Sequence, residues 1–263
     1  LEHGAIAPAK VTVARVVSRR ITPWDEFTGR VGAVETVQLR PRVSGYVESV
    51  EFTEGQQVKK GQVLFVLDDR SYRAALDRAE AELSRARSHA ALADSELRRA
   101  RQLAAEQLIS AELLEQRRAA TAQAASEVRS AQAVVAQARL DLDFTRVRAP
   151  IDGLAGRALV TTGNLAAPDS TVLTTLVSLD PVHVYFESDE QTYLRHARSD
   201  DGVRGGRNPV QVGLAGETGH PHEGELDFID NQVDARTGTI RARAVLPNPD
   251  STLTPGLYAR VRL

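Results

Sequence analysis

The sequence predicts an elongated, multidomain α+β protein. A split β-sandwich carries an inserted antiparallel α-helical coiled-coil hairpin, and a small β-barrel follows. Three observations support this fold class. The block 71–145 contains neither Gly nor Pro and is rich in strong helix formers. The β-type segments on either side of this block share an internal repeat. The section 181–263 alternates short apolar stretches with turn residues, as small all-β domains do.

Composition limits the classes of function. The 263 residues carry 33 basic and 35 acidic side chains, so the overall charge gives no sign of nucleic-acid binding. Cysteine is absent, which excludes structural disulfides, thiolate catalysis and cysteine-based metal sites. No run of 18 apolar residues occurs, so no segment of this sequence is expected to span a bilayer. The chain has no Met and begins at Leu1, so an earlier signal peptide or lipid-bearing start stays open.

The regions 10–67 and 181–263 have the pattern of short strands. In the first region apolar and polar residues alternate and β-branched residues are frequent, most clearly at 43–52. In the second region strands are expected at 182–187, 210–214, 224–229, 239–246 and 257–263, with a short helix near 190–198. Five short strands at close spacing indicate a small barrel or sandwich.

The block 71–145 has the heptad spacing of a coiled coil. Apolar or small residues alternate steps of three and four along both of its halves. These seam positions are Tyr72, Leu76, Ala79, Leu83, Ala86, Ala90, Ala93, Leu97, Ala100 and Ala104, and on the return Thr121, Ala124, Val128, Ala131, Val135, Ala138 and Leu142. Between the halves, Ser110 is a candidate N-cap for the second helix. Arms of about 34 to 36 residues are expected to project roughly 50 Å.

The internal repeat is interrupted by the helical block. Arg42-Val43-Ser44-Gly45 aligns with Pro150-Ile151-Asp152-Gly153. A second glycine follows ten residues later in each half, at Gly55 and Gly163, and each half then ends an apolar strand in Leu-Asp. Half-motifs of a few short strands cannot bury a face alone, so the two halves are expected to pair as one sandwich. The helices enter as an insertion whose ends lie close together, as an antiparallel hairpin requires.

The first half-motif resembles the biotinyl/lipoyl carrier fold. The resemblance is carried by Val43-x-Gly45-x-Val47-x-x-Val50-x-Phe52-x-Glu54-Gly55-x-x-Val58-x-x-Gly61-Gln62-x-Leu64. In carriers the next strand leads to a turn that displays a modifiable lysine beside methionines. Here Leu67-Asp68-Asp69-Arg70-Ser71 runs directly into the helical block, and Lys59 and Lys60 lie in an earlier turn. Lipoyl or biotin attachment is therefore not expected, and no cofactor is predicted.

The order of the modules resembles the periplasmic adaptor (membrane fusion protein) family, most closely the adaptors of resistance–nodulation–division multidrug efflux pumps. The matching segments follow the family's order along nearly the whole chain. They are Glu26-Phe27-Thr28-Gly29-Arg30, Arg40-Pro41-Arg42-Val43-Ser44-Gly45, Val147-x-Ala149-Pro150-Ile151-x-Gly153, Leu179-Asp180-Pro181-Val182, Phe228-Ile229-Asp230, Val233-Asp234, Thr237-Gly238-Thr239, Pro247-Asn248-Pro249-Asp250 and Leu253-x-Pro255-Gly256.

The resemblance implies four parts of the chain. They are an incomplete N-terminal segment of a membrane-proximal domain at 1–27, a β-barrel domain from 28–39 and 181–263, a lipoyl-like domain from 40–70 and 146–180, and the α-helical hairpin at 71–145. The rest of the membrane-proximal domain, which contacts the pump in the family, is expected to be missing. No pump-contacting residue is assigned for this reason. Hinges are expected where the parts join, near 68–71, 145–149 and 180–182.

The resemblance also implies a docking site for an outer-membrane channel at the hairpin tip. Family members that dock on such channels carry an Arg, a Leu four residues later and a Ser seven beyond that. Arg99, Leu103 and Ser110 match this spacing. An exposed tip of this kind offers a guanidinium, an apolar anchor and a hydroxyl to the channel. The alternative is structural: Leu103 packs in the tip, Ser110 only caps a helix, and Arg99 is a solvated charge.

The implied function is mechanical. The family's adaptors bridge an inner-membrane resistance–nodulation–division transporter, a drug/proton antiporter, and an outer-membrane channel. They self-associate into a ring, either a trimer or a hexamer, and the implied location is the periplasm, at the inner membrane. A lipid anchor on the full-length protein stays open. The adaptor turns over no bond, so no enzyme activity is predicted.

Other functions find less support in the residues. The histidines form no His-Glu-x-x-His motif, and no nucleophile elbow is present, which disfavours an enzyme. His220-Pro221-His222-Glu223 is the compact ligand-like cluster, but a solvated loop explains it better than a metal. The arginines of the helical block interleave with acidic residues, so a salt-bridged face is favoured over nucleic-acid binding. An adaptor for an ABC-type or other exporter, or a coiled-coil scaffold without a transport role, remains the alternative.

Overall fold

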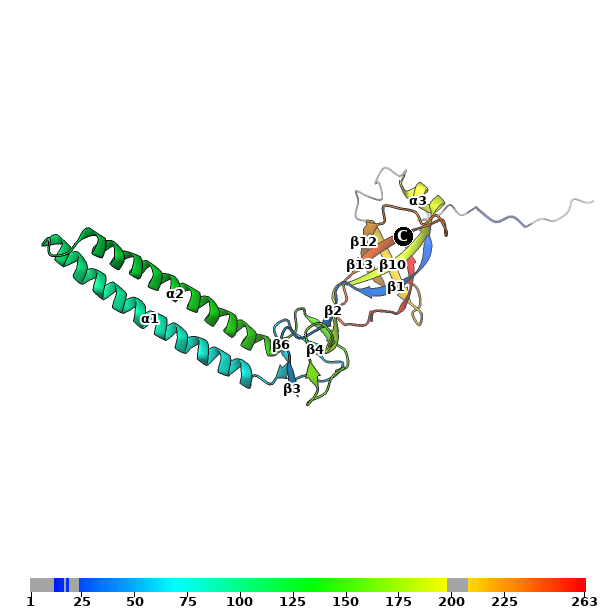
Figure 1. Ribbon diagram of the computed structural model, residues 1–263. Helices are drawn as coiled ribbons and strands as arrows, with labels where there is room; N and C mark the ends of the chain where they lie inside the picture. Colours follow the sequence, from blue (N-terminus) through cyan, green and yellow to red (C-terminus); the bar gives the residue numbers. More distant parts are fainter. Residues whose placement is uncertain (1–11, 17, 19–23, 198–207) are drawn as a thin grey trace, which may run out of the picture.

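The computed structural model describes residues 12–16, 18, 24–197 and 208–263. Three modules follow one another: a helical hairpin, a β-sandwich and a β-barrel (Figure 1). The hairpin projects from one end of the sandwich, and the barrel lies at the sandwich's other end. Within the described residues no helix is both long enough and apolar enough to cross a membrane. The predicted fold class, with its split sandwich, inserted hairpin and small barrel, is confirmed.

The hairpin consists of α1 (Arg70–Ala105) and α2 (Ala111–Phe144). The seam predicted from heptad spacing is the surface that the two helices bury against each other. The buried seam positions are Ala79, Leu83, Ala86, Ala93, Leu97, Ala100, Ala124, Ala131 and Val135. Alanine at so many of these positions allows the helix axes to approach closely. The hairpin therefore has a narrow apolar interior and is exposed on its remaining surface.

The sandwich contains two four-stranded sheets, and each half of the repeat supplies strands to both. One sheet has the order β2-β9-β7-β4 and the other β6-β5-β3-β8. The first half contributes β2 (Thr36–Leu39), β3 (Gly45–Val50), β4 (Gln57–Val58) and β5 (Val63–Leu67). The second half contributes β6 (Arg146–Arg148), β7 (Gly153–Ala155), β8 (Leu165–Ala166) and β9 (Thr174–Val177). The two half-motifs thus close one shared core, as the repeat predicts.

The roots of both helices are tied to the sandwich. The backbone N–H of Leu67 donates to the carbonyl of Thr145 at 2.8 Å, so the strand before α1 and the residue after α2 lie side by side. Tyr72 Oη donates to the Ser44 carbonyl at 2.6 Å. The Arg42 guanidinium lies 5.0 Å from the ring centroid of Phe144. These contacts fix both ends of the inserted hairpin on one side of the sandwich.

The barrel is closed by six strands in the order β1-β10-β13-β12-β11-β14. In chain order these are β1 (Glu26–Ala33), β10 (Val182–Asp189), β11 (Pro209–Leu214), β12 (His222–Ile229), β13 (Thr239–Leu246) and β14 (Tyr258–Arg262), with a short helix α3 (Glu190–Ala197) after β10. Every strand of the barrel pairs antiparallel with its neighbours. Its interior is filled by aliphatic side chains such as Val184, Leu246 and Val261, all fully buried.

One expected boundary is wrong. The segment 28–39 was expected in the barrel, but β2 (Thr36–Leu39) pairs with β9 and places Leu39 in the sandwich core. The chain leaves the barrel after Ala33. The backbone N–H of Glu35 donates to Ser178 Oγ, and the backbone N–H of Ser178 donates to the Glu35 carbonyl, so Glu35 is tied to the linker between the domains. β1 also begins at Glu26, inside the segment 1–27 that was expected to precede the barrel. In the remainder of the segment 1–27, residues 12–16 have no regular structure, and residues 1–11, 17 and 19–23 lie outside the described residues.

The junction between sandwich and barrel is held by a buried asparagine. Asn248, in the loop after β13, is 2% exposed. Its Nδ2 donates to the carbonyls of Leu179 and Leu253, at 2.7 and 3.2 Å. Its Oδ1 accepts from Leu253 N, and its own backbone N–H donates to Asp180 Oδ1 at 2.8 Å. One side chain thereby fastens the linker between the two domains to a loop of the barrel.

Candidate docking site at the hairpin tip

The tip of the hairpin is a tight, hydrogen-bonded turn. Leu108 N donates to the carbonyl of Leu103 at 2.9 Å, and Gln107 N donates to that of Ala104 at 3.0 Å. Gln107 has a φ of 59°, in the left-handed region. This pattern of bonds is the Schellman motif, in which the left-handed position is usually glycine. The turn therefore ends α1 sharply and reverses the chain within a few residues.

Two leucines are exposed at this turn. Leu103 is 41% exposed and Leu108 is 65% exposed. They occupy the two positions of a Schellman motif that commonly bear an apolar pair. Leu103 was predicted as a site residue, whereas Leu108 was missed. The sequence signal that could have identified Leu108 is its position five residues after Leu103, where the first helix ends.

Arg99 lies one helical turn before Leu103, on the exposed surface of α1. Its Nη1 donates to Ser95 Oγ at 2.9 Å. Two nearby arginines form ion pairs instead: Arg98 with Asp94 at 2.8 Å, and Arg117 with Glu96 at 2.7 Å. The guanidinium of Arg99 thus hydrogen-bonds to a neutral hydroxyl, and this contact does not neutralise its positive charge.

Ser110 caps the start of α2. Its Oγ accepts a hydrogen bond from Leu113 N at 3.2 Å, and its backbone is extended, as in an N-cap. The predicted N-cap is confirmed. The side chain is also exposed. Arg99, Leu103 and Ser110 all lie in the terminal section of the hairpin, and their docking role stays a prediction.

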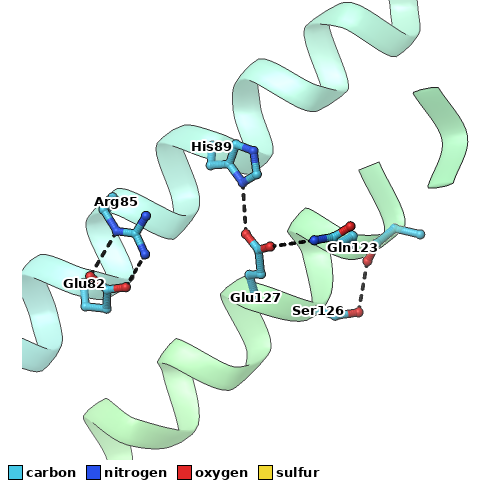
Figure 2. A network of polar contacts seen from close by, with 7 residues as sticks. Glu82, Arg85, His89, Gln123, Ser126 and Glu127 are labelled. Atoms are coloured by element: carbon cyan, nitrogen blue, oxygen red, sulfur yellow. Dashed lines mark hydrogen bonds and ion pairs between the residues drawn. The ribbon is translucent and has the colours of Figure 1, made fainter. Parts of the chain in front are cut away.

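The part of the hairpin between its tip and the sandwich, here called the shaft, has polar pairs between its two helices on both flanks of the seam. On one flank, His89 Nδ1 of α1 lies 2.9 Å from Glu127 Oε2 of α2, and Gln123 Nε2 donates to the other Glu127 oxygen at 3.3 Å (Figure 2). The hydrogen bond with His89, with a further one from Gln123, holds the pKa of Glu127 below its usual value. On the other flank, Arg139 of α2 pairs with Glu80 of α1 at 2.5 Å. These exposed pairs join the two helices across the seam and add a small contribution to its apolar packing.

The other candidate groups lie in a turn of the sandwich and at the start of β12 in the barrel. Lys59 and Lys60 lie in the turn between β4 and β5, where Lys60 N donates to Asp152 Oδ1 at 2.8 Å. His222 is the first residue of β12, and its Nε2 lies 2.9 Å from Oε1 of Glu217 in the β11–β12 connection, so the cluster 220–223 is not wholly the loop that was expected. Among the described residues, no three His, Asp or Glu side chains are grouped as a metal would require.

Comparison with protein families assigns the modules. The model of the RND MFP barrel-sandwich hybrid domain matches residues 35–178, and the model of the RND MFP beta-barrel domain matches residues 181–263. The chain belongs to the membrane fusion proteins of resistance–nodulation–division systems. The first match spans the sandwich and the hairpin together, and begins at the chain segment that leaves the barrel.

Curated relatives agree with this family. The chain is 36% identical to the multidrug export protein AcrE of Escherichia coli over 267 residues, covering 100% of this chain and 69% of AcrE. It is 36% identical to the efflux pump periplasmic linker BepF of Brucella suis, covering 97% of this chain and 62% of BepF. It is 34% identical to the multidrug efflux pump subunit AcrA of Escherichia coli, covering 100% and 67%. The chain thus spans about two thirds of the length of these relatives.

Solved structures share the fold. A MacA–MexA chimeric protein with the Pseudomonas aeruginosa MexA α-hairpin domain superposes with a TM-score of 0.65 at 22% identity. The alignment covers 92% of this chain and 82% of the chimera. A putative efflux transporter from Bacteroides eggerthii also superposes with a TM-score of 0.65 at 22% identity, covering 91% and 68%. The arrangement of hairpin, sandwich and barrel is therefore a shared architecture.

Proposed function

We propose that this protein is the periplasmic adaptor of a tripartite drug efflux pump. It bridges an inner-membrane drug/proton antiporter of the resistance–nodulation–division type and an outer-membrane channel. Membership of the family and the relatives AcrE and AcrA support this role. The proposed location is the periplasm, with association at the inner membrane. The role is that of a scaffold, in which no bond of the transported molecule is made or broken.

The observation that carries the proposal is the hairpin with its apolar tip. A helix of 36 residues extends roughly 50 Å from the body at 1.5 Å per residue. Its far end presents Leu103 and Leu108, both well exposed. A spoke of this length with leucines at the end is suited to reach and bind a second protein at a distance.

The tip is proposed to dock on the ends of the channel's helices. Leu103 and Leu108 supply apolar anchors, and Arg99 supplies a guanidinium that is not compensated by its Ser95 contact. Ser110 supplies a hydroxyl beside them. Exposed apolar side chains that lie together mark interaction sites, and arginine is enriched among interface hot spots. The channel surface is accordingly expected to present small apolar residues and carboxylate or carbonyl oxygens.

Copies of the adaptor are proposed to associate side by side into a ring, a trimer or a hexamer. The hairpins then stand together as a tube whose tips meet the channel. The buried seam and the cross-helix pairs on both flanks of the shaft support this role, because they hold the two helices of each hairpin together. The transported drug passes through the assembly.

An efflux complementation assay tests the proposal. The full-length protein is expressed in an adaptor-deleted strain together with its pump and channel, and drug resistance is measured. Leu103→Asp and Leu108→Asp are expected to abolish resistance. Leu92→Asp, on the same helix and 56% exposed but far from the tip, is the matched control and should retain it. Full resistance with both tip variants would contradict tip docking.

A further inference from the structure

The outer face of the barrel carries tyrosine and arginine side chains on neighbouring strands. Arg30 of β1 lies directly opposite Tyr185 of β10 on one side and Tyr258 of β14 on the other. Tyr185 and Tyr258 are 38% and 44% exposed, and Arg30 is also exposed. We call Tyr258, Arg30 and Tyr185 the Tyr–Arg–Tyr row. Tyrosine and arginine are enriched in protein interfaces and among their hot spots.

The surface at the Tyr–Arg–Tyr row is hollowed and could accept side chains of another protein. Gly32 has no side chain, and a Cβ there would lie 2.9 Å from Cε2 of Tyr185, so the tyrosine ring can lie across β1. A hollow of about 540 Å³ opens at the row, lined also by Thr28, Glu187 and Arg241. The Arg30 guanidinium donates one long hydrogen bond, 3.3 Å from Nη1 to the Gly256 carbonyl. The row therefore combines two exposed rings with a weakly held cation.

The opposite side of the same barrel has complementary chemistry. In the closed order β1-β10-β13-β12-β11-β14, β12 is three strands from β1 in either direction, so it lies across the barrel (Figure 1). There a hollow of about 570 Å³ is lined by Pro181, Pro209, Pro247, Gln211, Glu223 and Glu225, among others. We call it the proline-lined acidic groove. Its prolines are exposed and offer flat apolar faces, and the exposed Glu223 offers a carboxylate.

We propose that the Tyr–Arg–Tyr row of one copy docks in the proline-lined acidic groove of a second copy. The Arg30 guanidinium pairs with the Glu223 carboxylate, and the tyrosine rings pack on the prolines. The two surfaces differ and lie on opposite sides of one barrel, so the contact is heterologous. Each copy can bind one neighbour on either side, and the chain of copies becomes a ring when the rotation between neighbours closes. This inference rests on the proposed self-association and names the surfaces that produce it.

Cysteine cross-linking tests the contact directly, because the chain has no cysteine of its own. Thr28→Cys places a thiol beside the row, and Gln211→Cys places one in the groove. The purified chain with both substitutions is expected to form a ladder of disulfide-linked dimers, trimers and larger species on mild oxidation. A mixture of the two single variants should give heterodimers as its main product. A double variant that stays monomeric, or same-site dimers as abundant as heterodimers, would overturn the proposal.

A charge exchange provides an independent test by sedimentation equilibrium. Arg30→Glu and Glu223→Arg should each weaken self-association about tenfold, as loss of an interfacial charge pair does. The double variant should restore the affinity of the parent. Circular dichroism checks that each variant folds. Single variants that associate like the parent, or a double variant weaker than both singles, would overturn the pairing and leave the row to another partner, such as the pump. A failed efflux assay with an intact cross-link ladder would reject only the transport role.

Discussion

The hairpin and the barrel bury their apolar residues in opposite ways. In the hairpin a single seam is buried, and alanine fills it at Ala79, Ala86, Ala93 and Ala100, one residue per heptad. In the barrel every strand contributes to one enclosed core, with Val184, Leu246 and Val261 fully buried. Apolar burial per residue is therefore smaller in the hairpin, and it accumulates along its length. The barrel should unfold as one unit, whereas the hairpin can open locally from its tip.

The largest expected effect comes from the barrel core. Leu246→Ala should lower the free energy of barrel unfolding by about 3 kcal/mol, because it leaves a cavity in a core that cannot collapse around it. The single tryptophan, Trp24, lies directly before β1 and reports on the barrel by fluorescence during urea unfolding. The helical signal of the hairpin should change little in the same variant. Parallel loss of both signals would show that the two modules unfold together.

The junction offers the next largest effect. Asn248→Ala should cost about 2 kcal/mol, since it removes the bonds to Leu179 and Leu253 and leaves buried carbonyls unsatisfied. Small-angle scattering should also show a wider range of angles between sandwich and barrel. Asn231→Ala, an exposed asparagine of the same barrel, is the control and should behave like the parent. A junction equally rigid in both variants would show that Asn248 does not set this angle.

A smaller effect is expected in the hairpin seam. Ala124 is fully buried between the helices, so Ala124→Leu should force them apart and cost about 1 to 2 kcal/mol. Ala122→Leu, on the exposed side of α2, is the matched control. Thermal melting followed by circular dichroism at 222 nm measures both. Equal melting temperatures for the two variants would contradict the close-packed seam.

The smallest effect concerns pH at the hairpin root. The side-chain hydrogen bond from Arg70 lowers the pKa of Asp68 from 3.8 to about 2. A lowered folded-state pKa stabilises the fold above the unfolded value, and this stabilisation disappears as the pH falls through the folded value. The parent should therefore melt slightly higher than Asp68→Asn above about pH 4, and the difference should vanish near pH 2. A difference that persists at pH 2 would assign it to something other than this carboxylate.

The difference between the helical hairpin and the β-domains also explains what could be predicted from the sequence. The bounds of α1 and α2 and their seam were predicted correctly, because a heptad pattern lies within one continuous block. The assignment of β2 was wrong, because the sheet joined by a four-residue strand depends on a partner far along the chain, here β9. Sequence patterns describe local periodicity well, and they describe distant strand pairing poorly.

The candidate site follows the same rule. Arg99, Leu103 and Ser110 were proposed from the family resemblance, whose motif they match within one block, and their docking role stays a prediction. Leu108 was missed because Gln107 occupies the left-handed position of the turn, where glycine would have marked the Schellman motif. The Tyr–Arg–Tyr row could not be predicted either, because its members come from three strands that are distant in the sequence.

Photo-cross-linking in cells tests whether the hairpin tip binds an outer-membrane channel. A photoreactive phenylalanine analogue replaces Leu108 in the full-length protein, and in a matched variant it replaces Leu92 in the middle of the shaft. The tip position should capture an outer-membrane channel protein, identified by mass spectrometry, and the shaft position should not. Capture at the shaft alone, or no outer-membrane protein captured at the tip, would contradict the role of the hairpin as the arm that binds the channel.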